Sequence, residues 1–429
     1  MTHRPLLFVG GRVVDPSQNL DAKRDLLLVD GKVAALGEAL DPAPDARVVD
    51  ASGLVVTPGL IDVHVHLREP GQEHKETIAT GARAAAAGGF TAICSMPNTD
   101  PTIDDPAAVG FVVAEAKKAG AARVYPMGAI SVGLEGKALT EFGSLVEAGA
   151  VAVTDDGHPV MDSGLMRLAM EYAQAFDIPV VDHPEDLTLS RDGAMNEGLI
   201  SSRLGLKGKP NASEDIHIIR DILLAELTEG RIHIQHVSTR FGVEAIRQGK
   251  ARGVKVTGEA APHHLLLTDD DVDGYRTEAK MNPPLRSPED RDAVREGLKD
   301  GTLEVIATDH APHHYDEKEA AFEDAPNGIV GLETALGLVY GHLVEGGLLD
   351  LSTMVMRMSV TPARLFKLPG GTLSVGSPAD VTVFDPDGEW EVDPTTFLSK
   401  SQNTPFTGWT LRGMPRFTVV GGTVVWESE

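Results

Sequence analysis

The sequence lacks several features, and each absence excludes one class of protein. Cys94 is the only cysteine among 429 residues, which excludes a disulfide framework and fits a reducing cytosol. No apolar run approaches the roughly 18 residues of a membrane-spanning helix. The apolar run at residues 6–9 is too short for a signal-peptide core. These features predict a soluble, cytoplasmic protein.

Basic residues are also scarce. The chain has 38 lysines and arginines against 64 aspartates and glutamates, a formal net charge of −26. Nucleic acids and anionic membranes would repel such a chain, so neither is expected as a partner. The acidic residues are spread along the sequence, which indicates a solvated surface rather than a binding tail.

Strand-like and helix-like segments alternate through the middle of the chain. Eight such βα units predict a (β/α)8 TIM barrel over residues 58–367. Residues 1–57 and 368–429 are rich in short β segments, with turns at Asp30-Gly31 and Gly421-Gly422. We therefore expect a small β-sandwich domain formed by both termini. The eight barrel segments begin near residues 59, 90, 123, 151, 178, 231, 254 and 303.

The first barrel strand carries a His-x-His pair. Side chains alternate between the two faces of a strand, so His64 and His66 share one face. Two imidazoles at this spacing can bind one metal ion. The pair alone is equally compatible with two polar residues on a half-buried strand.

Other strands supply more metal-binding residue types at their ends. In a (β/α)8 barrel the carboxyl ends of the strands form one rim, where catalytic groups lie. Four histidines and two aspartates at that rim predict a metal centre, although a single histidine there would more often be a packed residue. The further strand ends are Asp155-Asp156, Asp182-His183, His233 to His236, and Asp309-His310.

This pattern resembles the amidohydrolase superfamily and, within it, the bacterial type I dihydroorotases. The resemblance rests on segments 62–71, 96–99, 154–157, 281–286 and 307–313, which together span nearly the whole barrel. It implies a zinc-dependent enzyme that reversibly hydrolyses (S)-dihydroorotate to N-carbamoyl-L-aspartate in pyrimidine (UMP) biosynthesis.

The resemblance implies two zinc ions per subunit, bridged by a carboxylate and a hydroxide. Many relatives bridge their metals with a carbamylated lysine, but no lysine lies between Lys137 and Lys207. Side-chain chemistry leaves Asp155 and Asp156 both open as the bridge, and the resemblance favours Asp156. Imidazole and carboxylate ligands suit zinc, and manganese or cobalt could substitute. The implied ligands are His64, His66, Asp156, His183, His236 and Asp309.

The implied chemistry is the attack of a hydroxide on a ring carbonyl. Two cations lower the pKa of a bridging water toward neutrality. By resemblance, Asp309 is the catalytic residue that accepts the proton and passes it to the leaving amide nitrogen.

Substrate binding requires positive charge in this acidic chain. Arg68 shares the face of His66, and its planar guanidinium suits a substrate carboxylate, although a salt bridge at the rim of the barrel is the alternative.

The loop 325–328 reads Ala-Pro-Asn-Gly where relatives usually show Pro-Phe-Gly, so an aromatic contact is missing. His263, His264 and His310 match no metal position and are expected to support the site. The implied substrate contacts are His66, Arg68, Asn98, Asn282, His313, and the backbone of Asn327 and Gly328.

Two other functions fit parts of this pattern. A hydantoinase would keep the fold, but the missing bridging lysine and Arg68 argue against it. A catalytically dead scaffold for aspartate transcarbamoylase would have lost metal ligands, and none is lost here. The resemblance also implies a homo-oligomer and association with an active aspartate transcarbamoylase as a possible partner.

Overall fold

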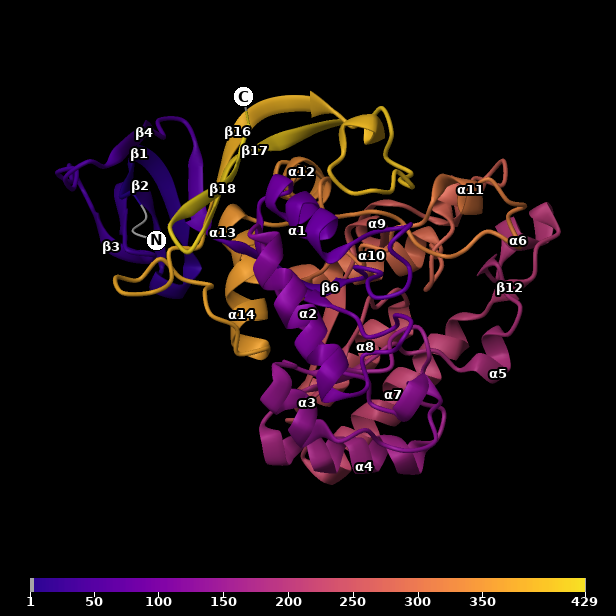
Figure 1. The fold of residues 1–429 in the computed structure, drawn as a ribbon. Helices are drawn as coiled ribbons and strands as arrows, with labels where there is room; N and C mark the ends of the chain where they lie inside the picture. Colours follow the sequence, from indigo (N-terminus) through magenta and orange to yellow (C-terminus); the bar gives the residue numbers. More distant parts are fainter. Residues whose placement is uncertain (1–3, 429) are drawn as a thin grey trace.

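Both ends of the chain contribute strands to one mixed sheet. The computed structural model describes residues 4–428. The sheet order is β18-β17-β16-β5-β1-β2-β3, with β4 paired to β1, so N-terminal and C-terminal strands meet where β5 pairs with β16 (Figure 1). The strands are β1 (Leu6–Asp15), β2 (Leu20–Val29), β3 (Lys32–Gly37), β4 (Arg47–Asp50), β5 (Val55–Pro58), β16 (Val381–Glu391), β17 (Thr410–Val420) and β18 (Thr423–Glu427).

The two predicted turns of this sheet are present. Asp30 and Gly31 connect β2 to β3, and Gly421 and Gly422 connect β17 to β18. All four residues have positive φ, which is the backbone conformation that tight hairpins between twisted strands require. Buried apolar side chains from both ends form one core beneath the sheet, including Phe8, Leu26, Val381, Val383 and Val419.

The central region contains the predicted parallel strands. They form two hydrogen-bonded groups, β6-β7-β8 and β9-β10-β13-β14-β15, each in the order shown. Isolated parallel bridges Gly128–Val153 and Val65–His310 join the two groups at both ends. The strands are β6 (Leu60–Val65), β7 (Phe90–Ser95), β8 (Arg123–Pro126), β9 (Val153–Thr154), β10 (Val180–Asp182), β13 (Ile232–Ile234), β14 (Val256–Ala260) and β15 (Val305–Ile306).

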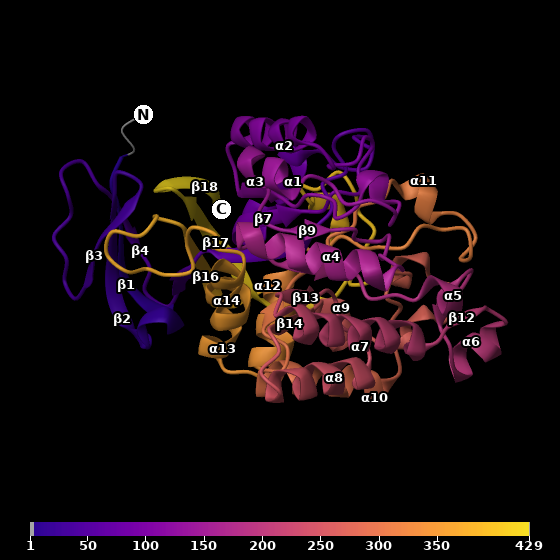
Figure 2. The same ribbon diagram turned by 90° about the horizontal axis from the view of Figure 1, so that it is seen from below.

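Helices lie around these strands, and α4, α7, α8 and α10 cover one side (Figures 1 and 2). The predicted α/β fold with parallel strands is confirmed. The helices are α1 (Ile78–Ala87), α2 (Pro106–Ala119), α3 (Phe142–Ala148), α4 (Ser163–Ala173), α5 (Leu187–Ser190), α6 (Leu199–Leu204), α7 (Asn211–Thr228), α8 (Arg240–Ala251), α9 (Pro262–Leu266), α10 (Pro288–Asp300), α11 (Tyr315–Lys318), α12 (Ala335–Leu338), α13 (Leu351–Val355) and α14 (Thr361–Leu365). The short strands β11 (Met195–Asn196) and β12 (Gly208–Lys209) pair outside both groups.

Local sequence signals set the helix ends. The side chain of Asp105 accepts hydrogen bonds from two backbone N–H groups at the start of α2, and Pro106 occupies its first turn. Gly120 ends the helix with φ of 63°, the left-handed conformation that glycine adopts without strain. Ser287, Pro288 and Gly301 do the same for α10.

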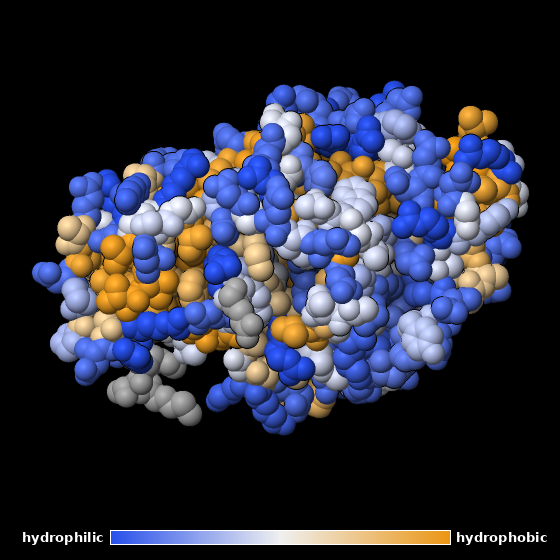
Figure 3. Space-filling view, turned by 90° about the horizontal axis from the view of Figure 1, so that it is seen from above, coloured by the Kyte–Doolittle hydropathy of each residue, from blue (hydrophilic) through white to orange (hydrophobic). Residues whose placement is uncertain are grey.

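The surface is mainly hydrophilic on the face shown in Figure 3, with hydrophobic residues gathered over the terminal sheet. In residues 4–428, no helix has the length and apolar character needed to cross a membrane.

Candidate active site

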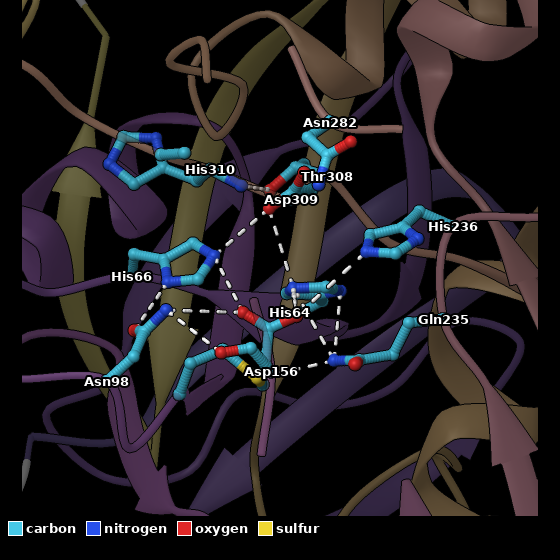
Figure 4. A network of polar contacts seen from close by, with 12 residues as sticks. His64, His66, Asn98, Asp156, Gln235, His236, Asn282, Thr308, Asp309 and His310 are labelled. Carbon is cyan, nitrogen blue, oxygen red and sulfur yellow. Dashed lines mark hydrogen bonds and ion pairs between the residues drawn. The ribbon is translucent and has the colours of Figure 1, made fainter. Parts of the chain in front are cut away.

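The six predicted metal ligands meet at the carboxyl ends of five parallel strands. His64 lies in β6 and His66 directly after it, and His183 follows β10 without a gap. Asp156, His236 and Asp309 lie within three residues of the ends of β9, β13 and β15. All six side chains are buried. Figure 4 shows His64, His66, Asp156, His236 and Asp309 directed toward one another.

Two three-residue groups share one carboxylate. The ligand atoms of His64, His66 and Asp156 lie within 4.8 Å of one another, and so do those of Asp156, His183 and His236. Asp156 Oδ1 is 3.4 Å from His64 Nε2 and 3.5 Å from His183 Nδ1. Asp156 Oδ2 is 3.3 Å from His66 Nε2. The carboxylate of Asp156 therefore stands between both groups.

Asp309 joins the group on β6. Its Oδ1 lies 3.1 Å from His66 Nε2 and 3.4 Å from His64 Nε2. Asp309 has φ of 51° and His236 has φ of 30°, conformations that non-glycine residues seldom adopt. Such backbone strain is typical of functional sites, where the surrounding structure holds a side chain in an unusual direction.

The cluster fits a metal site on its own geometry. Asp156 Oδ1 is buried and has no hydrogen-bond partner among the described residues, although a buried carboxylate oxygen normally has one. His236 Nε2 and His183 Nδ1 face each other at 2.9 Å. Imidazole nitrogens and carboxylate oxygens directed at common points form the donor set of divalent transition-metal sites.

The site keeps its carboxylates ionised. Burial opposes ionisation of Asp156, but the neighbouring imidazoles of His64 and His183 hold its pKa well below the ordinary value. Burial also opposes protonation of His183, yet the neighbouring carboxylates of Asp156 and Glu185 raise its pKa to about 10. The ionised carboxylates thus present anionic oxygens where cations would bind, and such cations would displace the protons from the imidazoles.

The two candidate bridging aspartates face different surroundings. Asp155 accepts a hydrogen bond of 3.0 Å from Ser131 N through Oδ1, and its Oδ2 accepts another from Ser131 Oγ. Asp156 contacts three histidines of the cluster. Neighbouring side chains at a strand end diverge, and here only Asp156 points into the cluster.

The histidines that match no metal position have other contacts. His310 Nε2 lies 3.5 Å from Glu76 Oε2, and His310 Nδ1 accepts a hydrogen bond from Gly331 N. His264 Nε2 donates to the carbonyl of Pro283 at 2.9 Å, next to Asn282. His263 is fully buried beside it.

Sequence reasoning missed Glu259 at the end of β14. His64 Nδ1 donates to Glu259 Oε1 at 2.6 Å, and Glu259 Oε2 lies 3.0 Å from His233 Nε2. This contact fixes the His64 tautomer so that Nε2 faces the cluster, an arrangement common behind metal-binding histidines. A glutamate at the end of a barrel strand was the only available signal.

We expect Glu259→Gln to lower metal affinity about 10- to 100-fold, because the amide no longer orients His64 as a carboxylate does. The measurement is metal content after dialysis against graded chelator. The exposed Glu296→Gln on α10 is the matched control and should retain the metal of the unmodified protein. Equal metal retention by both variants would contradict this role of Glu259.

A cavity of about 240 Å³ opens beside the cluster. Its lining includes every predicted substrate contact: His66, Arg68, Asn98, Asn282, His313, Asn327 and Gly328. Asn98 also accepts a hydrogen bond of 2.9 Å from His66 Nδ1, which leaves His66 Nε2 to face Asp309.

Arg68 is a buried cation without a carboxylate partner within ion-pair distance in residues 4–428. Its Nε donates to the carbonyl of Pro312 at 3.2 Å. Burial lowers the pKa of Arg68 to about 10, so the guanidinium remains charged at neutral pH. A buried charge without a counter-ion is costly, and an anionic ligand in the cavity would relieve that cost.

The loops of the cavity are held by residues that the sequence did not indicate. Asn403, from the C-terminal region, accepts from His313 N at 3.2 Å and donates to the carbonyls of Ala311 and Gly328. Lys318 Nζ also donates to the Gly328 carbonyl, at 3.1 Å. A Cβ at Gly328 would meet the Ala311 Cβ at 2.5 Å, so glycine is required for this close approach.

Asn282 is oriented by an ion pair. Lys209 Nζ donates to Glu185 Oε1 at 2.7 Å and to Asn282 Oδ1 at 2.8 Å. Asn282 Nδ2 in turn donates to Glu185 Oε2. Glu185 also contacts His183 Nε2, so the Lys209–Glu185 ion pair orients both the His183 ring in the metal cluster and the Asn282 amide in the cavity.

Comparison with known proteins agrees with this geometry. A family model described as "Dihydro-orotase-like" matches residues 53–241. Proteins named dihydroorotase from Geobacter metallireducens and Anaeromyxobacter sp. (strain K) are 54% and 56% identical. Each alignment covers 98% of this chain and at least 98% of the relative. The chain belongs to the dihydroorotase family.

The solved structures similar to this member of the dihydroorotase family include cyclic amide hydrolases. An L-hydantoinase (dihydropyrimidinase) from Arthrobacter aurescens has a TM-score of 0.88 and 29% identity, covering 100% of this chain and 96% of that one. A dihydropyrimidinase from Brevibacillus agri has a TM-score of 0.87 and 25% identity, covering 99% and 95%. The predicted family and enzyme class, a metal-dependent cyclic amide hydrolase, are confirmed.

Proposed function

We propose that this chain hydrolyses (S)-dihydroorotate to N-carbamoyl-L-aspartate and catalyses the reverse cyclisation, as a step of pyrimidine (UMP) synthesis. The observation that carries the proposal is the buried, unpaired Arg68 guanidinium in a cavity shared with the Asp156 and Asp309 carboxylates. The cation matches the substrate carboxylate, and the metal cluster lies where the ring carbonyl would be attacked. The full-length similarity to proteins named dihydroorotase supports this substrate.

Two zinc ions per subunit are the cofactor that the residues fit. His64, His66 and Asp309 would hold one ion, His183 and His236 the other, and Asp156 would contact both. When bound, such ions lower the pKa of water between them and polarise a carbonyl oxygen. Asp156 in place of a bridging lysine also supports membership in the type I group.

Asp309 is the residue proposed to move the proton. Burial opposes its ionisation, but His64 and His66 keep its pKa below the ordinary value, so it is a carboxylate at neutral pH. It accepts a proton from the attacking water and donates it to the ring nitrogen as the C–N bond breaks. The water oxygen remains in the new carboxylate, and the reverse reaction releases it as water.

The remaining cavity residues orient the ring. Arg68 binds the carboxylate through its planar fork, while His66, Asn98, Asn282 and His313 surround the ring. The backbone of Asn327 and Gly328 forms the adjacent wall, where this chain lacks the aromatic residue that relatives usually have.

We also propose that the central strands close into an eight-stranded (β/α)8 barrel spanning residues 58–367. The bridges Gly128–Val153 and Val65–His310 support closure, because they connect both ends of the two strand groups. Residues 1–57 and 368–429 form the second domain, and its sheet folds over itself as a sandwich. Phe8 in β1 and Phe417 in β17 support this, since their ring centroids are 5.7 Å apart although two strands separate β1 from β17.

Three further expectations stay predictions: a cytoplasmic location, a homo-oligomeric state and association with aspartate transcarbamoylase.

The decisive experiment is an assay of dihydroorotate hydrolysis and carbamoyl-aspartate cyclisation on metal-depleted and zinc-reconstituted protein. We expect turnover in both directions only after reconstitution, with metal content measured on the same samples. Dihydrouracil, which lacks the carboxylate, is the matched control substrate. No turnover of dihydroorotate by fully metallated protein, or faster turnover of dihydrouracil, would overturn the proposal; the second result would favour a hydantoinase-like activity.

A further inference from the structure

Two buried lysines hold the loop that forms one wall of the active-site cavity. Lys280 and Lys318, the last residue of α11, are each 5% exposed. In residues 4–428, neither ammonium has a carboxylate within ion-pair distance. Lysines are almost never buried without a partner, because burial of a charge without a counter-ion is costly. Their positions therefore indicate a specific role rather than ordinary packing.

Carbonyl oxygens take the place of a counter-ion at Lys318. Its Nζ donates to the carbonyls of Lys280 at 3.3 Å, Pro326 at 2.9 Å and Gly328 at 3.1 Å. An ammonium has three N–H groups, and all three are used here. A neutral amine has only two, so the full set of contacts requires the charged form.

Lys280 holds the preceding part of the same loop. Its Nζ donates to the carbonyls of Glu323 at 2.9 Å and Ala325 at 2.6 Å. The Lys280 carbonyl also accepts a hydrogen bond of 2.9 Å from Gly328 N. Gly328 is thus fixed at both its N–H and its carbonyl, and the two lysines provide both of these contacts.

The segment that Lys318 holds reaches the active-site cavity at Asn327 and Gly328. The Asn327 carbonyl accepts a hydrogen bond of 2.8 Å from His313 Nε2, and Asn403 Nδ2 donates to the Gly328 carbonyl at 3.0 Å. The Asn327 side chain is exposed, so no aromatic ring packs this wall in place. The wall and the His313 ring depend instead on polar contacts that lead back to Lys318.

We propose that Lys318 is a positioning residue for substrate binding. Its ammonium sets the position of the Asn327–Gly328 wall and, through the Asn327 carbonyl, the orientation of His313. Lys318 itself does not line the cavity, so it acts through these residues. Its charge also adds positive potential behind the wall, which favours an anionic ring. This inference rests on the proposed function, because it assigns Lys318 to the binding of dihydroorotate.

The first test compares KM and kcat for dihydroorotate on zinc-reconstituted protein. We expect Lys318→Met to raise KM about 10- to 100-fold and to change kcat less than about 3-fold, because a displaced wall weakens binding while the metal cluster stays intact. Metal content should match that of the unmodified protein. Lys299→Met on α10 is the matched control, since it makes the same change in charge at an exposed lysine. It should leave both constants unchanged.

The pH dependence of KM distinguishes positioning by charge from simple packing. Burial lowers the pKa of Lys318 to about 7, and the titratable groups that face it include Glu278, Lys280 and His313. The contacts of the ammonium are complete below that pH and weaken as it loses its proton. KM of the unmodified protein should therefore rise between about pH 6 and about pH 9. Lys318→Arg stays charged, so it should recover part of the affinity and show a flatter profile.

Hydrogen exchange at the Gly328 N–H tests the same contacts without substrate. Because this N–H is bonded to the Lys280 carbonyl, Lys318→Met should make it exchange at least about 10-fold faster, and Lys299→Met should not. An unmodified, fully metallated protein without dihydroorotate turnover would defeat the proposed function. The exchange measurement would still decide whether Lys318 positions the wall.

Three results would overturn the proposal. The first is equal KM and equal exchange for Lys318→Met and Lys299→Met, and the second is a loss of kcat in Lys318→Met without a change in KM. Thermal unfolding by circular dichroism shows whether Lys318→Met is folded. Where it is not, Lys318→Arg decides, and a KM that rises with pH as steeply as in the unmodified protein is the third contrary result.

Discussion

Asp156→Ala is expected to lower kcat/KM for dihydroorotate by at least about 10³-fold, because the substitution removes the only carboxylate shared by both groups of the cluster. The same variant should lose most of its bound metal. Without the carboxylate, four buried histidines would hold two cations with little anionic compensation. Metal content by mass spectrometry and initial rates on the same preparation measure both effects.

Asp155→Ala is the matched control at the adjacent position. Asp155 is as buried as Asp156 but bonds to Ser131, outside the cluster. We expect this variant to keep more metal than Asp156→Ala, with some loss of thermal stability because Ser131 loses its partner. The opposite order of metal content would assign the bridge to Asp155.

The ligand cluster was predictable because strand geometry is local. Alternation along a strand places His64 and His66 on one face, and the common rim of a barrel brings the ends of distant strands together. Side-chain chemistry then suffices to recognise a metal site. The choice between Asp155 and Asp156 was not predictable in this way, since it depends on which of two diverging side chains meets Ser131 and which meets the histidines.

The supporting residues were not predictable from local pattern. Glu259 contacts His64 across 195 positions of sequence, and Asn403 reaches His313 across 90. No motif marks either residue, because each acts through a contact that exists only in the folded chain. The backbone strain at His236 and Asp309 is hidden for the same reason, since neither is a glycine.

Long helices were predicted from the sequence more accurately than short helices and strands. The sequence predicts helices near residues 105–119 and 288–300, and α2 and α10 match these ranges to within a residue, with capping residues at both ends. The seven-residue α3 and the two-residue strands β11 and β12 went unpredicted, because segments this short depend on tertiary contacts rather than on periodicity. Helix α7 shows a related limit: apolar residues lie on both its buried and its exposed sides, so periodicity predicts the helix but not which side faces inward.

Arg68→Met should raise KM for dihydroorotate by about 10²- to 10³-fold, the usual cost of removing one member of a buried, hydrogen-bonded charge pair. Methionine fills a similar volume without charge. Turnover of dihydrouracil should change much less, since that ring has no carboxylate to bind. The difference between the two substrates, measured from initial rates, isolates the charge contribution from any packing defect.

The result for Arg68→Met would also indicate how an acidic protein binds an anionic substrate. With a net charge of −26, the surface slows the approach of anions, so affinity must come from a local cation in a low-dielectric cavity. Arg68 can supply it because its φ of 61° turns the chain at the end of the β6 segment and its side chain lines the cavity. Arg68→Lys keeps the charge but not the planar fork, and it should recover only part of the affinity. Equal losses for dihydroorotate and dihydrouracil in Arg68→Met would remove Arg68 from carboxylate recognition and leave its buried charge to a structural role.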